Sequence, residues 1–195
     1  MANKLRAGIV GATGMVGQRF ITLIADHPYF EITALVASPS SAGKTYGEAV
    51  KGRWMMSTPI PAGIADMVVL NAEDIESVKP HVDFVFCAIN MDKKYVAALE
   101  EAYAKAEIPV VSNNSAHRGT PDVPMLIPEI NYAHTEVIKA QRERLGTKKG
   151  FISVKPNCSI QSYAPALEPL RKYGIKAVNV TTFQAISGAG KNFDT

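Results

Sequence analysis

The sequence has 195 residues, of which 47% are hydrophobic, enough for one complete domain and part of a second. Its 21 lysines and arginines against 18 aspartates and glutamates give a net charge of +3, without the clustered basic excess typical of nucleic-acid binders. Two cysteines argue against a disulfide scaffold, and no apolar run approaches the length of a membrane span.

The first predicted elements alternate between strand and helix. Residues 5–10 form an apolar run typical of a buried strand, and apolar side chains at helical spacing favour a helix over 14–27. A second strand is predicted over 31–37. No signal-peptide layout precedes the first strand, so we expect a cytoplasmic protein.

The same alternation continues along the chain and predicts a parallel sheet with crossover helices. Residues 38–66 lack periodicity, and residues 113–128 form a long loop of the kind that often carries function. The basic run over 139–150 is interpreted as a solvated helix end and turn. The remaining predictions are strands over 83–89, 108–112 and 151–154, helices over 92–107 and 158–174, and a strand with one open face over 176–187.

Three glycines lie where the first strand meets the first helix. Gly11 suits the tight turn, Gly14 allows the backbone to approach a phosphate, and the start of the helix offers free N–H groups and a positive dipole end. The spacing is G-x-x-G-x-x-G rather than the commoner G-x-G-x-x-G, but its position favours a dinucleotide-binding cradle over a simple glycine-rich turn. The cradle residues are Gly11, Thr13, Gly14, Met15, Val16 and Gly17.

The segment after the second strand bears on the choice of nucleotide. NAD-specific sheets usually end this strand with an acid that binds the ribose 2′-hydroxyl, and the sequence LVASPSSAGK has no acid. Hydroxyl and ammonium groups suit a 2′-phosphate instead, so the sequence favours NADP, with a solvated Ser/Pro turn as the alternative. The candidate residues are Ser38, Ser40, Ser41 and Lys44.

Cys158 follows Pro156 and Asn157 and opens a predicted helix. A thiolate at a helix N-terminus is stabilised by the dipole and by free N–H groups, and a thiolate is the form that attacks a carbonyl. Cys87 lies among apolar neighbours in DFVFCAI and is expected in the core. Position and composition alone leave a nucleophile and a core residue equally open for Cys158.

Five motifs follow one another along the chain: GATGMVGQ, SNNSAHR, IPEIN, KPNCSIQ and QAISGAG. With them the sequence resembles the aspartate-β-semialdehyde dehydrogenases over its whole length, in particular the branch shared by archaea, fungi and some bacteria. The resemblance implies an α/β fold, with a Rossmann-type parallel sheet forming an NADP-binding domain over residues 1–155. Residues 156–195 would begin a second α+β domain for catalysis and dimerisation.

The resemblance also implies a reversible reaction. Cys158 would attack the aldehyde of aspartate semialdehyde, a hydride would pass from the hemithioacetal to NADP, and phosphate would release aspartyl phosphate from the thioester. Biosynthesis would run the other way, towards lysine, threonine and methionine. The implied partners are these small molecules and further copies of the chain, as a dimer or tetramer, with no metal, nucleic acid or membrane.

The matching positions imply roles for single residues. Asn157 would help to hold the oxyanion, Gln184 would orient the substrate after acylation, and Arg118 would bind the phosphate, a task suited to a planar guanidinium. Further residues of the active cleft would be Asn114, Glu129 and Asn131. The small residues beside the nicotinamide would be Ser187, Gly188 and Gly190.

The sequence departs from the family pattern in two ways. Related sequences commonly carry arginine at the position of Ser40, so we expect only a modest preference for NADP. The family's general-base histidine and its arginine for the substrate carboxylate are expected beyond Thr195, and none of the four histidines stands in the context of that base. We therefore expect an incomplete chain that alone does not turn over aspartate semialdehyde.

Two other functions stay open. A paralogous malonyl- or succinyl-CoA reductase would share the cradle and the cysteine. A non-catalytic nucleotide-binding fragment would keep the cradle and lose turnover. Titration with NADP, followed by an assay of hydride transfer, distinguishes a binding module from an enzyme.

Overall fold

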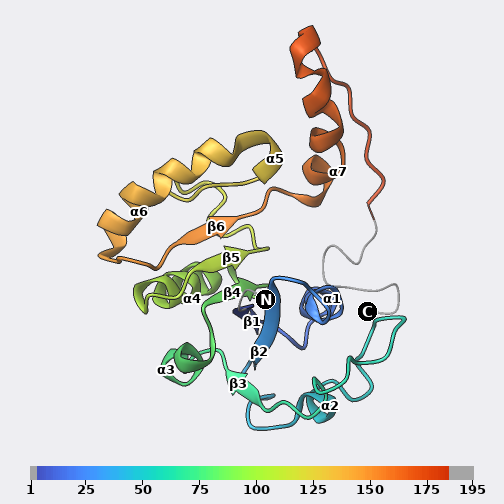
Figure 1. Cartoon of the computed structure of the whole chain (residues 1–195), viewed down its shortest axis with the longest axis vertical. Coiled ribbons are helices and arrows are strands. Elements are labelled where there is room, and N and C mark those ends of the chain that lie inside the picture. The colour runs from blue at the N-terminus through green and yellow to red at the C-terminus, as the bar shows by residue number, and fades with distance from the viewer. Residues whose placement is uncertain (1–3, 185–195) are drawn as a thin grey trace.

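A six-stranded parallel sheet organises residues 4–184, the part of the chain that this computed structural model describes (Figure 1). The strand order is β3-β2-β1-β4-β5-β6, that of a Rossmann-type sheet. Five strands confirm the sequence prediction, whereas β3 lies in a segment for which the pattern predicts no element. The strands are β1 (Leu5–Val10), β2 (Phe30–Ala37), β3 (Val69–Asn71), β4 (Phe84–Cys87), β5 (Val110–Ser112) and β6 (Ile152–Val154).

Helices connect the strands and cover both faces of the sheet (Figure 1). They are α1 (Met15–Ile24), α2 (Tyr46–Ala49), α3 (Ile75–Val78), α4 (Lys93–Lys105), α5 (Pro128–Asn131), α6 (Ile138–Leu145) and α7 (Cys158–Leu167), with 3-10 turns η1 (Lys79–His81), η2 (Tyr132–Val137) and η3 (Glu168–Tyr173). The basic run does contain a helix end, because α6 stops at Leu145 and Gly146 takes a left-handed conformation. None of the helices in that part of the chain is both long and apolar enough to cross a membrane.

Side chains alternate along the central strands, so the sheet carries a core on each face. On β1, Val10 belongs to the core that α4 covers, and Ile9 belongs to the core on the opposite face. The second core is closed by Ile21 of α1 and Tyr46 of α2. Both faces of the sheet are therefore buried, as is usual for parallel strands.

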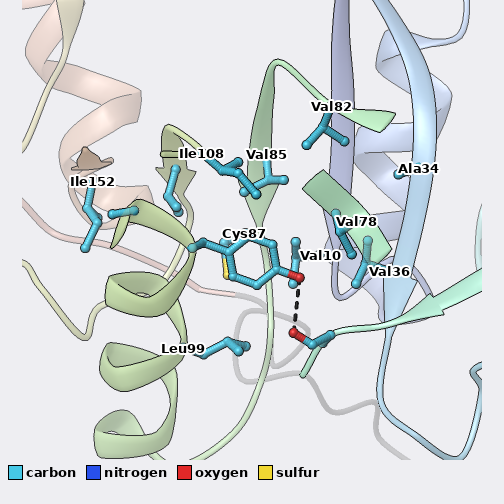
Figure 2. Close-up of a cluster of buried hydrophobic side chains, with 14 of the residues drawn as sticks. Val10, Ala34, Val36, Val78, Val82, Val85, Cys87, Leu99, Ile108 and Ile152 are labelled. Carbon is cyan, nitrogen blue, oxygen red and sulfur yellow. Dashed lines mark hydrogen bonds between the residues drawn. The ribbon is translucent and has the colours of Figure 1, made fainter. Parts of the chain in front are cut away.

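Cys87 lies in the core beneath α4, where Figure 2 shows it among Val10, Val36 and Val85. Its side chain is 2% exposed. Burial, and then the nearby carboxylate of Glu100, raise the pKa of the Cys87 thiol well above its ordinary value. The prediction of a core position for Cys87 is confirmed.

The helix that begins at Cys158 projects away from the sheet (Figure 1). It continues as η3 to Tyr173, and Gly174 follows in a left-handed conformation. The predicted strand is wrong over residues 176–184, which run back beside α7 as exposed, irregular chain, and residues 185–187 lie outside the described residues. A strand forms by pairing its main-chain groups with a neighbour, and within residues 4–184 no strand lies beside this segment.

Candidate functional site

A cleft of about 700 Å³ lies along the carboxyl ends of strands β1 to β5. Its walls are residues 11 and 13–16 after β1, 37–39 at and after the end of β2, 72–73 after β3, 88–91 after β4, 93, 95 and 96 in α4, and 113–116 with Arg118 after β5. The strand order reverses between β1 and β4, and in open α/β sheets ligands bind outside the carboxyl ends of the strands at this reversal. The cleft is therefore the candidate binding site.

The turn from β1 to α1 is built for close approach. Gly11 has a φ of +89°, and a Cβ there would lie 2.7 Å from the carbonyl oxygen of Ala88. A Cβ on Gly17 would overlap the carbonyl oxygen of Gly11. Gly14 caps α1 without a side chain, so the first N–H groups of the helix, at Met15 and Val16, are free of intrahelical partners. These features fit the phosphates of a dinucleotide.

Two buried side chains bond the carbonyl groups of this turn on the side that faces the core. The hydroxyl of Tyr46 donates to the carbonyl of Ala12 at 2.8 Å. The amide of Gln18 donates to the carbonyl of Thr13 at 3.0 Å and to that of Arg53 at 2.8 Å. Sequence reasoning missed both residues, although a polar side chain on the inner face of an apolar helix, as at Gln18, is a signal that could have found one of them.

The loop after β2 contributes Ser38 to the cleft wall. The hydroxyl oxygens of Ser38 and Ser40 are 3.0 Å apart, and the ammonium of Lys44 donates to the carbonyl of Ser40 at 2.8 Å. Ser41 is buried, and its N–H donates to the carbonyl of Ser38 at 2.9 Å. Of the predicted nucleotide-selecting residues, Ser38 thus lies in the cleft wall. Ser41 supports the loop after β2 from the buried side, and Lys44 bonds the same loop without lining the cleft.

The loop after β5 is fixed by a buried carboxylate of α4. Glu100 is 1% exposed, and its Oε1 accepts from the hydroxyl of Ser112 at 2.5 Å and from the side-chain amide of Asn114 at 2.9 Å. The main-chain N–H of Asn114 donates to the Ser112 hydroxyl at 3.0 Å. The predicted residue Asn114 therefore lines the cleft in a fixed position, while Glu100 and Ser112 were not predicted.

Arg118 connects this loop to the segment that carries the cysteine. Its Nε donates to the carbonyl of Lys155 at 3.1 Å, and its Nη2 donates to the carbonyl of Asn113 at 3.3 Å. Burial, and then the charge of Arg118, lower the pKa of Lys155. The predicted anion-binding arginine thus sits between the cleft wall and the start of α7.

Three predicted catalytic residues gather at the N-terminal end of α7. Cys158 is its first residue, and the thiol is exposed. Asn157 is the N-cap, because its Oδ1 accepts from the N–H of Ile160 at 2.9 Å. The side-chain amide of Gln184 donates to the hydroxyl of Ser159, next to the cysteine.

Other predicted site residues are not brought to the cleft. Asn131 closes α5 locally, since its side chain accepts from the N–H of Ile127 at 2.8 Å and donates to the carbonyl of Met125 at 2.9 Å. Glu129 is exposed on the same short helix. Neither belongs to the cleft wall among residues 4–184. Ser187, Gly188 and Gly190 lie outside the described residues.

Comparison with known proteins gives consistent matches. The family model described as semialdehyde dehydrogenase, NAD binding domain, matches residues 6–138. Aspartate-semialdehyde dehydrogenase of Methanothermobacter thermautotrophicus is 43% identical over 189 residues, which are 96% of this chain and 52% of that protein. The Saccharomyces cerevisiae enzyme of the same name is 41% identical over 199 residues, 97% of this chain and 52% of that protein. The chain thus spans about half the length of the curated relatives it matches.

A solved structure has the same fold. The crystal structure of aspartate semialdehyde dehydrogenase with NADP from Candida albicans superposes with a TM-score of 0.75 at 37% identity. The match covers 88% of this chain and 48% of that one.

Proposed function

The chain belongs to the semialdehyde dehydrogenase family, and from this premise we propose that it is the NADP-binding part of an aspartate-semialdehyde dehydrogenase, together with its cysteine. The NADP-binding domain would be residues 1–155, and residues 156–195 would open the catalytic and dimerisation domain. The whole enzyme would interconvert aspartate semialdehyde and aspartyl phosphate for amino-acid biosynthesis. It would work as a homo-oligomer in the cytoplasm.

One observation carries the proposal. Arg118 lines the glycine-rich cleft and also bonds the segment that leads to the exposed Cys158. The cleft offers free helix N–H groups for a pyrophosphate, and Ser38 stands in its wall where a ribose phosphate is expected. The NADP bound to the Candida albicans relative supports this choice of cofactor. Arg118 contacts the carbonyl of Lys155, three positions ahead of Cys158.

Each site residue has a proposed role in this reaction. Cys158 presents an exposed thiol that, as thiolate, forms a bond to the substrate carbonyl carbon, while the carbon–oxygen π bond breaks and its electron pair moves to the oxygen. Asn157 fixes the start of the helix that carries this thiol, and Gln184 lies beside it to orient the acyl group. Arg118 offers a cationic fork for phosphate. NADP would be held by the glycine turn after β1 and by Ser38, and it would supply hydride transfer at the substrate carbon.

The test begins with the 195-residue chain. Calorimetric titration with NADP should give saturable binding, and its absence would sink the proposal. A steady-state assay with aspartate semialdehyde, phosphate and NADP should give turnover for the full product of the gene and none after Cys158→Ser. Turnover of malonyl-CoA or succinyl-CoA instead would identify an acyl-CoA reductase, and binding without turnover by the full product would identify a non-catalytic nucleotide-binding protein.

A further inference from the structure

The back of the glycine turn is held by groups that do not touch the cleft. Tyr46 is 0% exposed and Gln18 is 1% exposed. The Tyr46 hydroxyl bonds the carbonyl of Ala12, and the Gln18 amide bonds the carbonyl of Thr13. The carbonyl groups of Ala12 and Thr13, which follow one another in the turn, therefore point towards the core, where each accepts from a buried side chain.

Peptide geometry converts this arrangement into an orientation of the N–H groups. In a planar trans peptide the C=O and N–H groups point in opposite directions. Fixing the carbonyl of Ala12 against Tyr46 therefore fixes the N–H of Thr13 on the side away from the core, and Thr13 lines the cleft. The N–H of Gly14 closes the turn by donating to the carbonyl of Gly11 at 3.1 Å.

We propose that Tyr46 and Gln18 are positioning residues for the phosphates of the dinucleotide, because they hold the main chain of the cradle in its donor-presenting form before the ligand arrives. This inference rests on the proposed binding of NADP. Preorganised donors bind more tightly because less ordering is required on binding. Phenylalanine fills almost the same space as tyrosine, so Tyr46→Phe removes the hydrogen bond to Ala12 and leaves the packing of the ring in place.

Gln18 extends the support to a second segment. Its Oε1 accepts from the N–H of Met55 at 2.7 Å, while its amide also bonds the carbonyl of Arg53. Trp54 lies between these residues, and its ring packs edge-on against Tyr46 with centroids 6.3 Å apart. Because Trp54 is the one tryptophan in the chain, its fluorescence reports on this packing.

The chain offers a matched control. Tyr103 is also buried, and its hydroxyl donates to the carbonyl of Ala72 at 3.1 Å within the core that Figure 2 draws. Tyr103→Phe removes the same kind of hydrogen bond as Tyr46→Phe. Ala72 follows β3 and also lies in the cleft wall, but β3 is two strands away from β1, so this bond does not hold the glycine turn. A difference between the two variants therefore isolates the effect of holding the cradle.

The experiment compares the wild type with Y46F and Y103F, using NADP and adenosine 2′-monophosphate, which lacks the 5′-phosphates. Calorimetry and Trp54 fluorescence give dissociation constants. We expect Y46F to weaken NADP binding about three- to tenfold, the size of one lost hydrogen bond, and to leave adenosine 2′-monophosphate unchanged. Y103F should leave both affinities within about twofold of the wild type. Gln18→Met should reproduce the Y46F pattern.

Amide exchange without ligand supplies a separate readout. The amides of Ala12 and Gly14 should exchange faster in Y46F than in the wild type and Y103F, since the turn opens more often. Equal NADP affinities in Y46F and Y103F, or equal losses for both ligands, would overturn the inference. If the wild type does not bind NADP, the proposed function fails, and unchanged exchange in Y46F would then show that Tyr46 does not hold the turn either.

Discussion

Arg118 and Lys155 are joined by a hydrogen bond of 3.1 Å from the guanidinium Nε to the main-chain oxygen. The contact spans 37 residues of sequence and crosses from the loop after β5 to the end of β6. Arg118 lines the cleft, and Cys158 begins α7 three positions after Lys155. Arg118 therefore fixes the position of the cleft wall relative to the start of the helix that carries the thiol.

The two thiols should react at very different rates. Cys158 is exposed, whereas Cys87 is buried, and burial together with Glu100 raises the pKa of its thiol. We expect iodoacetamide at neutral pH to label Cys158 more than about tenfold faster, because only an accessible thiolate reacts. Peptide mapping of the folded protein checks this, with Cys158→Ser as the control that should remain almost unlabelled. A first adduct on Cys87 would contradict the prediction.

Lys44 should contribute to the choice of nucleotide. Its ammonium bonds the carbonyl of Ser40, above the loop that follows β2, where no acid is present to bind a ribose hydroxyl. Lys44→Ala should weaken NADP binding about two- to fivefold and leave NAD unchanged, because an exposed ion pair is worth less than about 1 kcal/mol. Lys79→Ala is the control for loss of charge, because Lys79 lies in the turn η1 that leads into the amino end of β4 and is not part of the cleft wall. Equal effects on NADP and NAD in calorimetry would refute the role.

The strands that the sequence predicts are those whose pattern is local. β1 and β2 are largely apolar segments of six and eight residues. β3 has three residues, as have the predicted strands β5 and β6, so its length does not explain why it is not predicted. The apolar run MVVL over residues 67–70 is a signal that could have found it. The alternation over residues 176–184 resembles a strand, but alternation without a neighbouring strand does not fix one.

The site shows the same division. The glycine turn is predictable because strand, glycines and helix are contiguous. Tyr46 is not, since its hydroxyl acts on a carbonyl 34 residues earlier. Glu100 is not predictable either. Two adjacent glutamates in a helix are typical of a solvated face, and Glu100 is buried because it bonds Ser112 on another element. Asn131 is predicted from its motif alone, and its side chain closes its own helix.

Two glycines of the cradle should separate stability from binding. A Cβ on Gly17 would overlap the carbonyl of Gly11, so Gly17→Ala should cost about 3 kcal/mol of the free energy of unfolding. A Cβ on Gly14 would meet the Gly11 carbonyl at an ordinary 3.5 Å, so Gly14→Ala should cost about 1 kcal/mol or less. Because Gly14 lines the cleft, that variant should nevertheless weaken NADP binding about tenfold or more. Urea unfolding and calorimetry measure the two effects, and unchanged NADP affinity in Gly14→Ala would count against the cradle.

Neighbouring glutamates of α4 should differ sharply in their contribution to stability. Glu100 is buried and bonds Ser112 and Asn114, so Glu100→Ala leaves buried donors without an acceptor. We expect a loss of about 3 kcal/mol in the free energy of unfolding. Glu101 forms a half-exposed ion pair with Arg144, and Glu101→Ala should cost less than about 1 kcal/mol. Similar urea midpoints for the two variants would show that the Glu100 bonds do not matter to the fold.

Glu107 fixes the turn that leads into β6. It has a φ of 68°, a left-handed conformation that is uncommon outside glycine. Its carboxylate accepts from the main-chain N–H groups of Lys148 at 2.9 Å, Lys149 at 2.6 Å and Gly150 at 2.8 Å. These hydrogen bonds lower the pKa of Glu107 from its ordinary 4.5 to about 2. The folded state therefore stabilises the ionised carboxylate of Glu107 over its protonated form.

This pKa shift sets the sign of a pH effect. Because the folded-state pKa lies below the unfolded value, Glu107 stabilises the fold fully above about pH 4.5 and loses that contribution as the pH falls towards 2. Glu107→Gln should lower the urea midpoint at pH 6, and the gap to the wild type should narrow steadily between pH 4.5 and pH 3, where the wild-type carboxylate also begins to lose its advantage. Glu76→Gln, on the exposed side of α3, should show no gap at pH 6. No gap at pH 6 would mean that the three N–H groups bind the amide as well as the carboxylate, and a gap that stayed constant over this range would mean that the ionisation of Glu107 does not contribute to the difference.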